Sequence, residues 1–241
     1  MEKPITILAI IPARKGSKGV AGKNMKILGE KPLIQYTIES ALQSKLLTRI
    51  AVSSDCEDTI EFAQKFEGVE APFIRPAELS GDCVPSVPVM KHAIEFFRKN
   101  STEFDYVCLL QPTSPFRSAG LIDKTILHLL THDADSLATV QKIPDKYNPS
   151  WAFYESGDQL ISPVIEALLP TRRQDLRDAY CRDGKIYLVK TQWLDQDQLL
   201  AGKCLGYQTM DEEDLNINTM EDWKHAETYI ELCNQPISAH C

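Results

Sequence analysis

The chain lacks long hydrophobic runs, close cysteine pairs and an excess of positive charge. No apolar stretch in its 241 residues approaches the roughly 20 residues that a membrane helix needs. The opening residues, MEKPITILAIIPAR, show no signal-peptide cleavage pattern. A formal net charge of -8 at pH 7 argues against a general nucleic-acid binder. These absences predict a cytoplasmic protein that binds neither membranes nor nucleic acid.

The cysteines and histidines fit no disulfide framework and no common metal site. The seven cysteines form no Cys-x-x-Cys pair and are odd in number, which indicates free thiols in a reducing compartment. Cys108 lies in the apolar run YVCLL and is expected in the core. The five histidines match neither HExxH nor a Cys/His zinc spacing. A zinc enzyme is therefore not expected.

Short β-rich runs alternate along the chain with helical patterns. The first four segments are ITILAII, PLIQYTIESALQ, RIAVSS and CEDTIEFAQKF. Such alternation is typical of βαβ units around a parallel sheet, and the length fits one large α/β domain over residues 1–241. Thr219 and Asp222 give a closing helix a capping-box-like start. The other expected elements are helices over 87–99 and 119–130 and strands over 106–110, 136–140, 185–189 and 204–208.

A change in composition interrupts this alternation after Lys142. The stretch 142–181 is rich in prolines and aromatic residues and has no clean βαβ pattern. It is interpreted as an inserted subdomain or an oligomer contact.

The loop after the first expected strand reads IIPARKGSKGVAGKN over residues 10–24. A P-loop would need glycine where Ser17 stands and a hydroxyl residue where Asn24 stands, and its helix would begin earlier. The glycines are spaced GxxGxxG, which is not the dinucleotide fingerprint. Glycines and cations at the end of a parallel strand suit a polyphosphate, because backbone amides and positive charge both face the ligand. An ordinary loop with solvated lysines is the alternative.

A second segment, LLQPTSPFR over residues 109–117, begins as a buried strand and ends in a polar turn. The amide of Gln111, at the carboxyl end of that strand, could read the edge of a base or a sugar. A simple proline turn is the alternative.

Together these two segments resemble the acylneuraminate cytidylyltransferases, also called CMP-sialic acid synthetases. IPARKGSKGVAGKN matches the family form IPARxxSKGxxxKN, and LLQPTSPFR matches LLQPTSPxR. RPAELSGD, DGKIY and NINTMEDW extend the similarity over nearly the whole chain. The related Kdo cytidylyltransferases typically read GKP where this chain reads Gly22-Lys23-Asn24, so they rank second.

The resemblance implies a Rossmann-like nucleotidyltransferase fold with a mainly parallel sheet and a small dimerisation subdomain inserted over 142–181. It also implies a homodimer that converts CTP and an acidic nine-carbon keto sugar into the CMP-sugar and pyrophosphate, with Mg²⁺ as cofactor. N-acetylneuraminate is the expected sugar. Legionaminate, pseudaminate, deaminated sialate and Kdo are the alternatives, as is a nucleotide-binding relative without catalysis.

The family's functional residues map onto this chain in three groups. The catalytic triphosphate cations are Arg14, Lys18 and Lys23. The other nucleotide contacts are Ala13, Ser17, Asn24, Arg75 and Ser86, with Arg14 counted here as well. The sugar contacts are Gln111, Arg173, Arg182 and Tyr187.

One departure from the family concerns the metal. The family commonly reads DIDT where this chain has Asn216-Ile217-Asn218-Thr219. An asparagine offers magnesium a carbonyl oxygen but no charge. Magnesium could then be held mainly by the triphosphate, or nearby acids could substitute, or catalysis could be lost; we expect a working enzyme. The nearby acids are Asp211, Glu212, Glu213, Asp214 and Asp222.

A second departure concerns the sugar. Many sialate-specific members carry arginine one position before Arg182, and asparagine where Asp183 stands. Arg182 could still grip the sugar carboxylate from its shifted position, since a guanidinium binds a carboxylate bidentately. This departure from the family pattern therefore leaves the identity of the sugar open.

Overall fold

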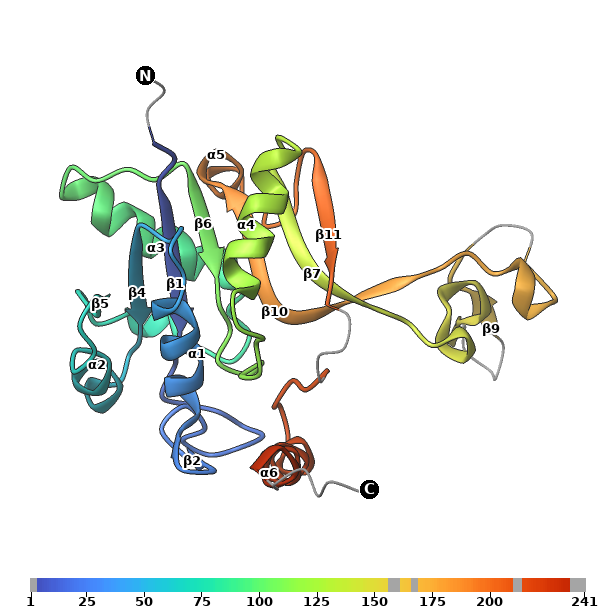
Figure 1. Ribbon diagram of the computed structural model, residues 1–241, viewed down its shortest axis with the longest axis horizontal. Helices are drawn as coiled ribbons and strands as arrows, with labels where there is room; N and C mark the ends of the chain where they lie inside the picture. Colours follow the sequence, from blue (N-terminus) through green and yellow to red (C-terminus); the bar gives the residue numbers. More distant parts are fainter. Residues whose placement is uncertain (1–3, 156–160, 166–168, 210–213, 235–241) are drawn as a thin grey trace, which may run out of the picture.

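The computed structural model describes residues 4–155, 161–165, 169–209 and 214–234. Its centre is a seven-stranded sheet with the strand order β11-β7-β10-β6-β1-β4-β5 (Figure 1). Four neighbouring pairs are parallel, and β10 runs antiparallel to both of its neighbours. The expected α/β class with a mainly parallel sheet is confirmed. The strands are β1 (Ile7–Pro12), β4 (Arg49–Ser53), β5 (Val69–Glu70), β6 (Tyr106–Leu109), β7 (Ser136–Lys142), β10 (Tyr180–Lys190) and β11 (Cys204–Gln208).

Helices cover both faces of this sheet. They are α1 (Leu33–Leu42), α2 (Glu57–Ala63), α3 (Ser86–Lys99), α4 (Leu121–Thr131) and α5 (Thr191–Asp195). A further helix, α6 (Met220–Asn234), packs instead against Leu28 and Leu33. A short ribbon, β2 (Ile27–Leu28) with β3 (Lys31–Pro32), precedes α1. Single-turn 3-10 helices are η1 (Ala77–Leu79), η2 (Asp145–Tyr147), η3 (Pro149–Trp151) and η4 (Arg173–Asp175). Within the described ranges, no helix is both long and apolar enough to cross a bilayer.

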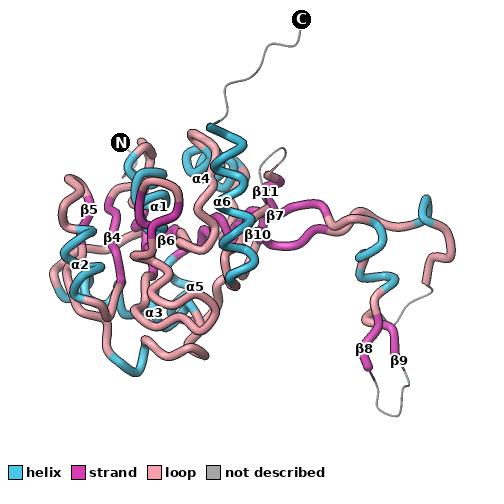
Figure 2. Tube along the Cα trace, turned by 90° about the horizontal axis from the view of Figure 1, so that it is seen from below, coloured by secondary structure: helices cyan, strands magenta, loops and turns pink. Residues whose placement is uncertain are grey.

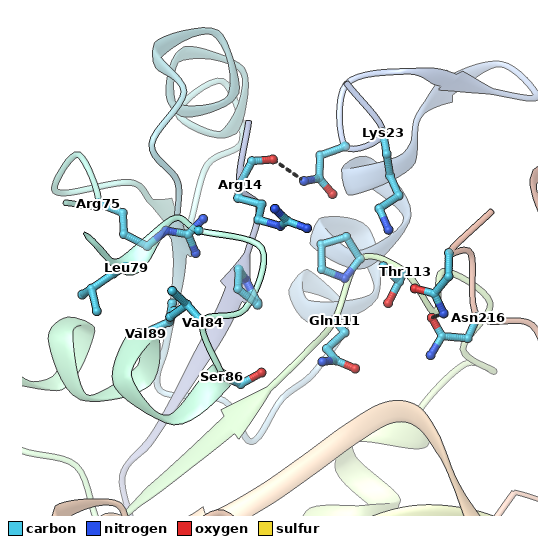
Figure 3. A pocket seen from close by; sticks show the side chains of 15 residues that line it. Arg14, Lys23, Arg75, Leu79, Val84, Ser86, Val89, Gln111, Thr113 and Asn216 are labelled. Carbon is cyan, nitrogen blue, oxygen red and sulfur yellow. Dashed lines mark hydrogen bonds between the residues drawn. The ribbon is translucent and has the colours of Figure 1, made fainter. Parts of the chain in front are cut away.

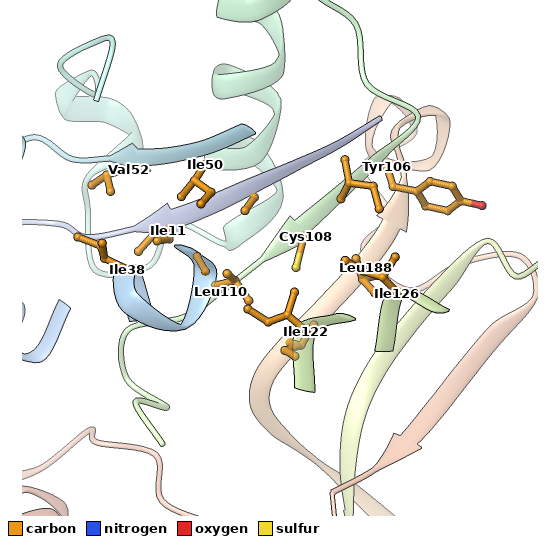
Figure 4. Close-up of a cluster of buried hydrophobic side chains, with 14 of the residues drawn as sticks. Ile11, Ile38, Ile50, Val52, Tyr106, Cys108, Leu110, Ile122, Ile126 and Leu188 are labelled. Atoms are coloured by element: carbon orange, nitrogen blue, oxygen red, sulfur yellow. The ribbon is translucent and has the colours of Figure 1, made fainter. Parts of the chain in front are cut away.

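The central strand β1 is buried on both faces, which explains its continuous apolar sequence. Ile7, Ala9 and Ile11 pack with α1 and α4 in one core cluster (Figure 4). Leu8 and Ile10 point the other way, because successive side chains of a strand alternate, and they pack with α3. Cys108 lies in the first cluster, as expected, and burial raises the pKa of its thiol to about 12.

The described residues between 143 and 179 leave the sheet as a projecting arm (Figures 1 and 2). Strands β7 and β10 run out together to its base, where Lys142 pairs with Tyr180. The arm carries the hairpin of β8 (Phe153–Glu155) and β9 (Ile161–Pro163). Tyr147 and Tyr154 are more than 60 % exposed on it. The predicted insertion 142–181 corresponds to this arm, and its role in dimerisation stays a prediction.

Candidate active site

A cavity of about 290 Å³ opens beyond the carboxyl ends of β1 and β6 (Figure 3). Leu79, Val84 and Val89 form an apolar wall on one side, while Lys23 and Asn216 lie on the other. We call it the nucleotide cavity. Its further lining residues are Pro12, Arg14, Asn24, Arg75, Gly81, Ser86, Gln111, Pro112, Thr113 and Asn218.

The loop that follows β1 is tied to its surroundings by backbone contacts. The Nδ2 group of Asn24, which is buried, donates to the backbone oxygen of Arg14 at 3.0 Å. The backbone oxygen of Asn24 accepts from Ile34 N at 3.0 Å, so the loop is anchored to the first turn of α1. Because α1 begins only at Leu33, the loop is too long for a P-loop. The sequence-based exclusion of a P-loop is confirmed.

Lys23 joins this loop to the segment that precedes α6. Its Nζ donates to the backbone oxygen of Ile217 at 2.9 Å. Burial, together with the positive charge of Arg14, lowers the pKa of Lys23 below its ordinary value. Gly19 packs equally closely, since a Cβ at that position would lie 1.7 Å from the backbone oxygen of Asn218. The two ends of the chain therefore build one side of the cavity together.

Asp82 bridges two of the predicted triphosphate cations. Its carboxylate accepts a hydrogen bond from Arg14 and lies 3.1 Å from Lys18 Nζ. These contacts, led by Arg14, hold the pKa of Asp82 below its ordinary value. The Lys18 side chain is 82 % exposed and lines neither cavity. Asp82 is the last residue of the RPAELSGD segment, and no role for it was predicted from the sequence.

Arg75 places a buried guanidinium against the nucleotide cavity. Its side chain is 3 % exposed, and its Nε donates to Ser80 Oγ at 3.1 Å. One terminal nitrogen lies 3.6 Å from Asp55 Oδ1 but makes no hydrogen bond. Burial lowers the pKa of Arg75, and Asp55 partly offsets that effect. Because buried donors are almost always satisfied, this nitrogen is suited to a ligand acceptor.

A second cavity of about 510 Å³ lies beside the first. We call it the sugar cavity, after the sugar contacts predicted above. It shares Ser86, Gln111 and Asn216 with the nucleotide cavity, so the two meet at these residues. Its further lining residues are Pro85, Val87, Arg182, Gly184, Tyr187, Asp197 and Leu199.

Gly184 shapes the junction between the cavities, a role that sequence reasoning missed. Its φ of +77° favours glycine, and a Cβ there would lie 2.9 Å from both Asn216 Nδ2 and Ser114 Oγ. The buried Asp183 carboxylate holds this irregular part of β10 by accepting from Lys185 N at 3.0 Å and Thr209 Oγ1 at 2.7 Å. Gly184 lies in the DGKIY segment, whose similarity to the family was noted. The sequence did not reveal that Gly184 has a positive φ, because no sequence pattern marks that conformation here.

Most of the predicted site residues lie together. Arg14, Lys23, Asn24, Arg75, Ser86, Gln111, Asn216 and Asn218 line the nucleotide cavity, and Arg182 and Tyr187 join the sugar cavity. Ala13, the residue after β1, is buried and donates its N–H to Ser53 O at 2.9 Å. Neither Ala13 nor Ser17 lines a cavity. Arg173 lies on the arm, hydrogen-bonded to Asp145, and lines neither cavity of its own chain.

The side chains of the predicted metal ligands, Asn216 and Asn218, lie together and form a hydrogen bond with each other. Asn218 Nδ2 donates to Asn216 Oδ1 at 3.3 Å. Asp222 caps α6 by accepting from the backbone N–H groups of Asn218 and Thr219 at 2.8 and 2.7 Å. No three His, Cys, Asp or Glu side chains within the described ranges could hold a metal. These residues do not fit a protein-held magnesium site; Asp211, Glu212 and Glu213 lie outside the described residues.

Known proteins are similar to this chain in sequence and in fold. The cytidylyltransferase family model matches residues 8–149. Pseudaminic acid cytidylyltransferase of Campylobacter jejuni (strain 81-176) is 32% identical over 220 residues, which cover 91% of this chain and 94% of that protein. CMP-N,N'-diacetyllegionaminic acid synthase of Legionella pneumophila is 32% identical over 237 residues, covering 94% and 97%.

Two further comparisons concern sialate and fold. N-acylneuraminate cytidylyltransferase of Escherichia coli O18:K1:H7 is 31% identical over 224 residues, which cover 92% of this chain but 51% of that protein. The solved structure of CMP:2-keto-3-deoxy-manno-octonic acid synthetase complexed with CTP has a TM-score of 0.71 at 17% identity, covering 94% of this chain and 99% of that one. This similarity confirms the Rossmann-like nucleotidyltransferase fold. The resemblance drawn from the sequence motifs is confirmed, and the chain belongs to the cytidylyltransferase family as a nucleotidyltransferase enzyme.

Proposed function

We propose that the protein transfers the cytidylyl group of CTP to a nonulosonate, giving the CMP-sugar and pyrophosphate. The observation that carries this proposal is the junction of two unlike cavities at Gln111 and Asn216. A reaction that joins a nucleotide to a sugar needs two such sites in contact, because the reacting atoms must approach within about 3–3.5 Å.

The nucleotide cavity suits CTP in both halves. Arg14 and Lys23 supply positive charge for the triphosphate at the end of β1. The apolar side chains of Leu79 and Val84 offer a surface for the flat base, and the unbonded nitrogen of Arg75 offers it a donor. Charge and apolar surface are therefore separated as they are in a nucleotide.

The sugar cavity suits an acidic sugar. Arg182 provides a guanidinium for the carboxylate, and Tyr187 and Gln111 provide polar groups for hydroxyl or acyl oxygens. We propose a sugar of the pseudaminate or legionaminate type ahead of N-acetylneuraminate. The named pseudaminic and legionaminic relatives match over more than 90% of their own length. The named N-acylneuraminate relative matches over 51% of its length.

The transfer step follows from this arrangement. The anomeric hydroxyl oxygen of the sugar attacks the α-phosphorus, a new O–P bond forms, the bond to the β-phosphate oxygen breaks, and the hydroxyl proton leaves. Negative charge builds on phosphoryl oxygens beside Arg14 and Lys23, so these cations stabilise the transition state. Loss of one such cation costs about 3 kcal/mol of transition-state stabilisation by analogy with other preorganised donors.

We also propose that two copies of the chain assemble through the arm, whose exposed aromatic side chains include Tyr147, Phe153 and Tyr154. In that assembly Arg173, which lines neither cavity of its own chain, would serve the partner's site. We also propose that the protein is located in the cytoplasm.

The experiment is a pyrophosphate-release assay of the purified protein with CTP, Mg²⁺ and a panel of keto-sugar acids. We expect pyrophosphate and a CMP-sugar, identified by mass spectrometry, from at least one nonulosonate, and no product when CTP is replaced by ATP. CTP binding without pyrophosphate from any sugar would instead favour a nucleotide-binding protein without catalysis.

A further inference from the structure

We infer that this chain neutralises the triphosphate with its own cations and amides, so that CTP binds without a protein-held divalent ion. Any metal then enters and leaves only as part of the metal–CTP complex. The inference rests on the proposed function, because it takes CTP as the ligand. It concerns the residues of this chain that depart from the family's carboxylate pattern.

The charge of the nucleotide cavity is one-sided. Three cationic side chains line it, those of Arg14, Lys23 and Arg75. Among the lining residues that the structure describes, none is acidic. Asp82 and Asp55 pair with Arg14 and Arg75 but line neither cavity. A fully ionised triphosphate therefore meets positive charge at the cavity wall and needs no cation between itself and a lining carboxylate.

The amides at the back of the cavity present donors. Asn216 Oδ1 already accepts from Asn218 Nδ2 at 3.3 Å. Asn216 Nδ2 lies beside Gly184, where a Cβ would be 2.9 Å away, and Asn216 lines both cavities. An N–H group in that position suits a phosphoryl or sugar oxygen, whereas Mg²⁺ requires oxygen ligands.

Four described carboxylates that contact residues of the two cavities or line one of them are already bonded to donors of the protein. Asp82 is bonded to two cations of the loop. Asp55 accepts from Lys15 N at 2.7 Å, and Asp222 accepts from two backbone N–H groups at the start of α6. Asp197, which lines the sugar cavity, pairs with Lys91 at 2.9 Å. None of the four is left for a metal without breaking such a contact.

The test measures CTP binding by calorimetry in EDTA and in Mg²⁺. For the wild-type protein we expect the two Kd values to differ by less than about threefold, because the cavity's own cations do the neutralising. The double variant Asn216→Asp/Asn218→Asp adds two negative charges beside the triphosphate. We expect it to bind CTP at least about tenfold more weakly in EDTA than in Mg²⁺.

The matched control is Asn100→Asp. Asn100 is exposed at the far end of α3, a 14-residue helix whose first residue, Ser86, lines the cavity. It makes the same chemical change outside both cavities and is expected to behave as wild type. The single variant Asn218→Asp, at an exposed position, serves if the double variant unfolds at a lower temperature.

A parallel titration uses Mn²⁺ alone on the nucleotide-free protein. We expect no saturable binding to wild type at millimolar concentration and binding to the double variant. Wild-type CTP binding that collapses more than about tenfold in EDTA, or saturable Mn²⁺ binding that Asn216→Ala removes, would overturn the inference alone. Failure of CTP to bind in both buffers would overturn the proposed function as well, so the two failures are distinguishable.

Discussion

The two cavities differ in the groups that they present to a ligand. The nucleotide cavity combines three cations with an apolar wall and is anchored through Asn24 to the first turn of α1. The sugar cavity carries Arg182 and Asp197, and Arg182 comes from β10, the strand that also runs out to the arm. The nucleotide cavity therefore presents several cations beside an apolar wall, whereas the sugar cavity presents one arginine and one aspartate around the junction at Gly184.

Removal of Lys23 should cause the largest loss. Lys23→Met takes a positive charge from the nucleotide cavity and breaks the bond to the Ile217 carbonyl. We expect kcat/KM for CTP to fall about 100-fold, which corresponds to about 3 kcal/mol. Steady-state kinetics measure it, and Lys23→Arg should recover part of the rate. The exposed Lys45→Met variant is the control for loss of a lysine elsewhere, and equal kinetics of Lys23→Met and that control would remove Lys23 from the mechanism.

Removal of Arg182 should weaken binding of the sugar and leave binding of CTP unchanged. Arg182→Ala deletes the guanidinium of the sugar cavity and leaves the nucleotide cavity intact. We expect kcat/KM for the sugar to fall about 30-fold, because a charged hydrogen bond contributes about 2 kcal/mol. KM for CTP should stay within about twofold of wild type. A variant that weakens both substrates equally would contradict the separation of the cavities.

Lys18 tests how far the triphosphate site extends beyond the cavity. Lys18 is exposed and paired with Asp82 in the nucleotide-free protein. We expect Lys18→Ala to lower kcat about tenfold, a smaller loss than for Lys23 because an exposed charge is screened by solvent. Lys15→Ala, three residues earlier and also exposed, is the matched control. Normal turnover of folded Lys18→Ala would confine the site to the cavity.

The smallest expected effect concerns pH. Burial and Arg14 lower the pKa of Lys23, so Lys23 loses its proton at a lower pH than an ordinary lysine. Because the neutral amine cannot attract the triphosphate, kcat/KM for CTP should fall on the alkaline side below the ordinary lysine range. Lys23→Arg should move that fall to higher pH. A pH–rate profile of the two proteins, unchanged by the substitution, would assign the alkaline limb to another group.

Much of the fold could be predicted because its elements are buried in regular patterns. Strand β1 reads as a continuous apolar run, and α3 covers 86–99 where a helix was expected over 87–99. Strand β10 was expected only over 185–189, but it begins at Tyr180. Its first residues, Tyr180–Arg182, are exposed and pair with β7 outside the core. They carry no hydrophobic alternation, so no local pattern marks them as strand.

The sequence predicted the site residues that lie in motifs with characteristic polar side chains. It did not predict the residues that tertiary packing brings to the site. Cations and amides in IPARKGSKGVAGKN and LLQPTSPFR indicated Arg14, Lys23 and Gln111. The apolar wall of Leu79 and Val84 was missed, because isolated apolar residues in a single-turn helix and the loop after it have no periodicity. The bond between Lys23 and Ile217 joins positions 194 residues apart, and no sequence spacing reports such a contact.

The most direct test of the assignment of the two cavities is a crystal structure of the protein in complex with CTP. We expect the triphosphate against Arg14 and Lys23, the base beside Arg75 and the apolar wall, and the α-phosphate at the junction near Gln111 and Asn216. A nucleotide bound in another place, or a triphosphate turned away from the β1 loop, would contradict the assignment of the two cavities.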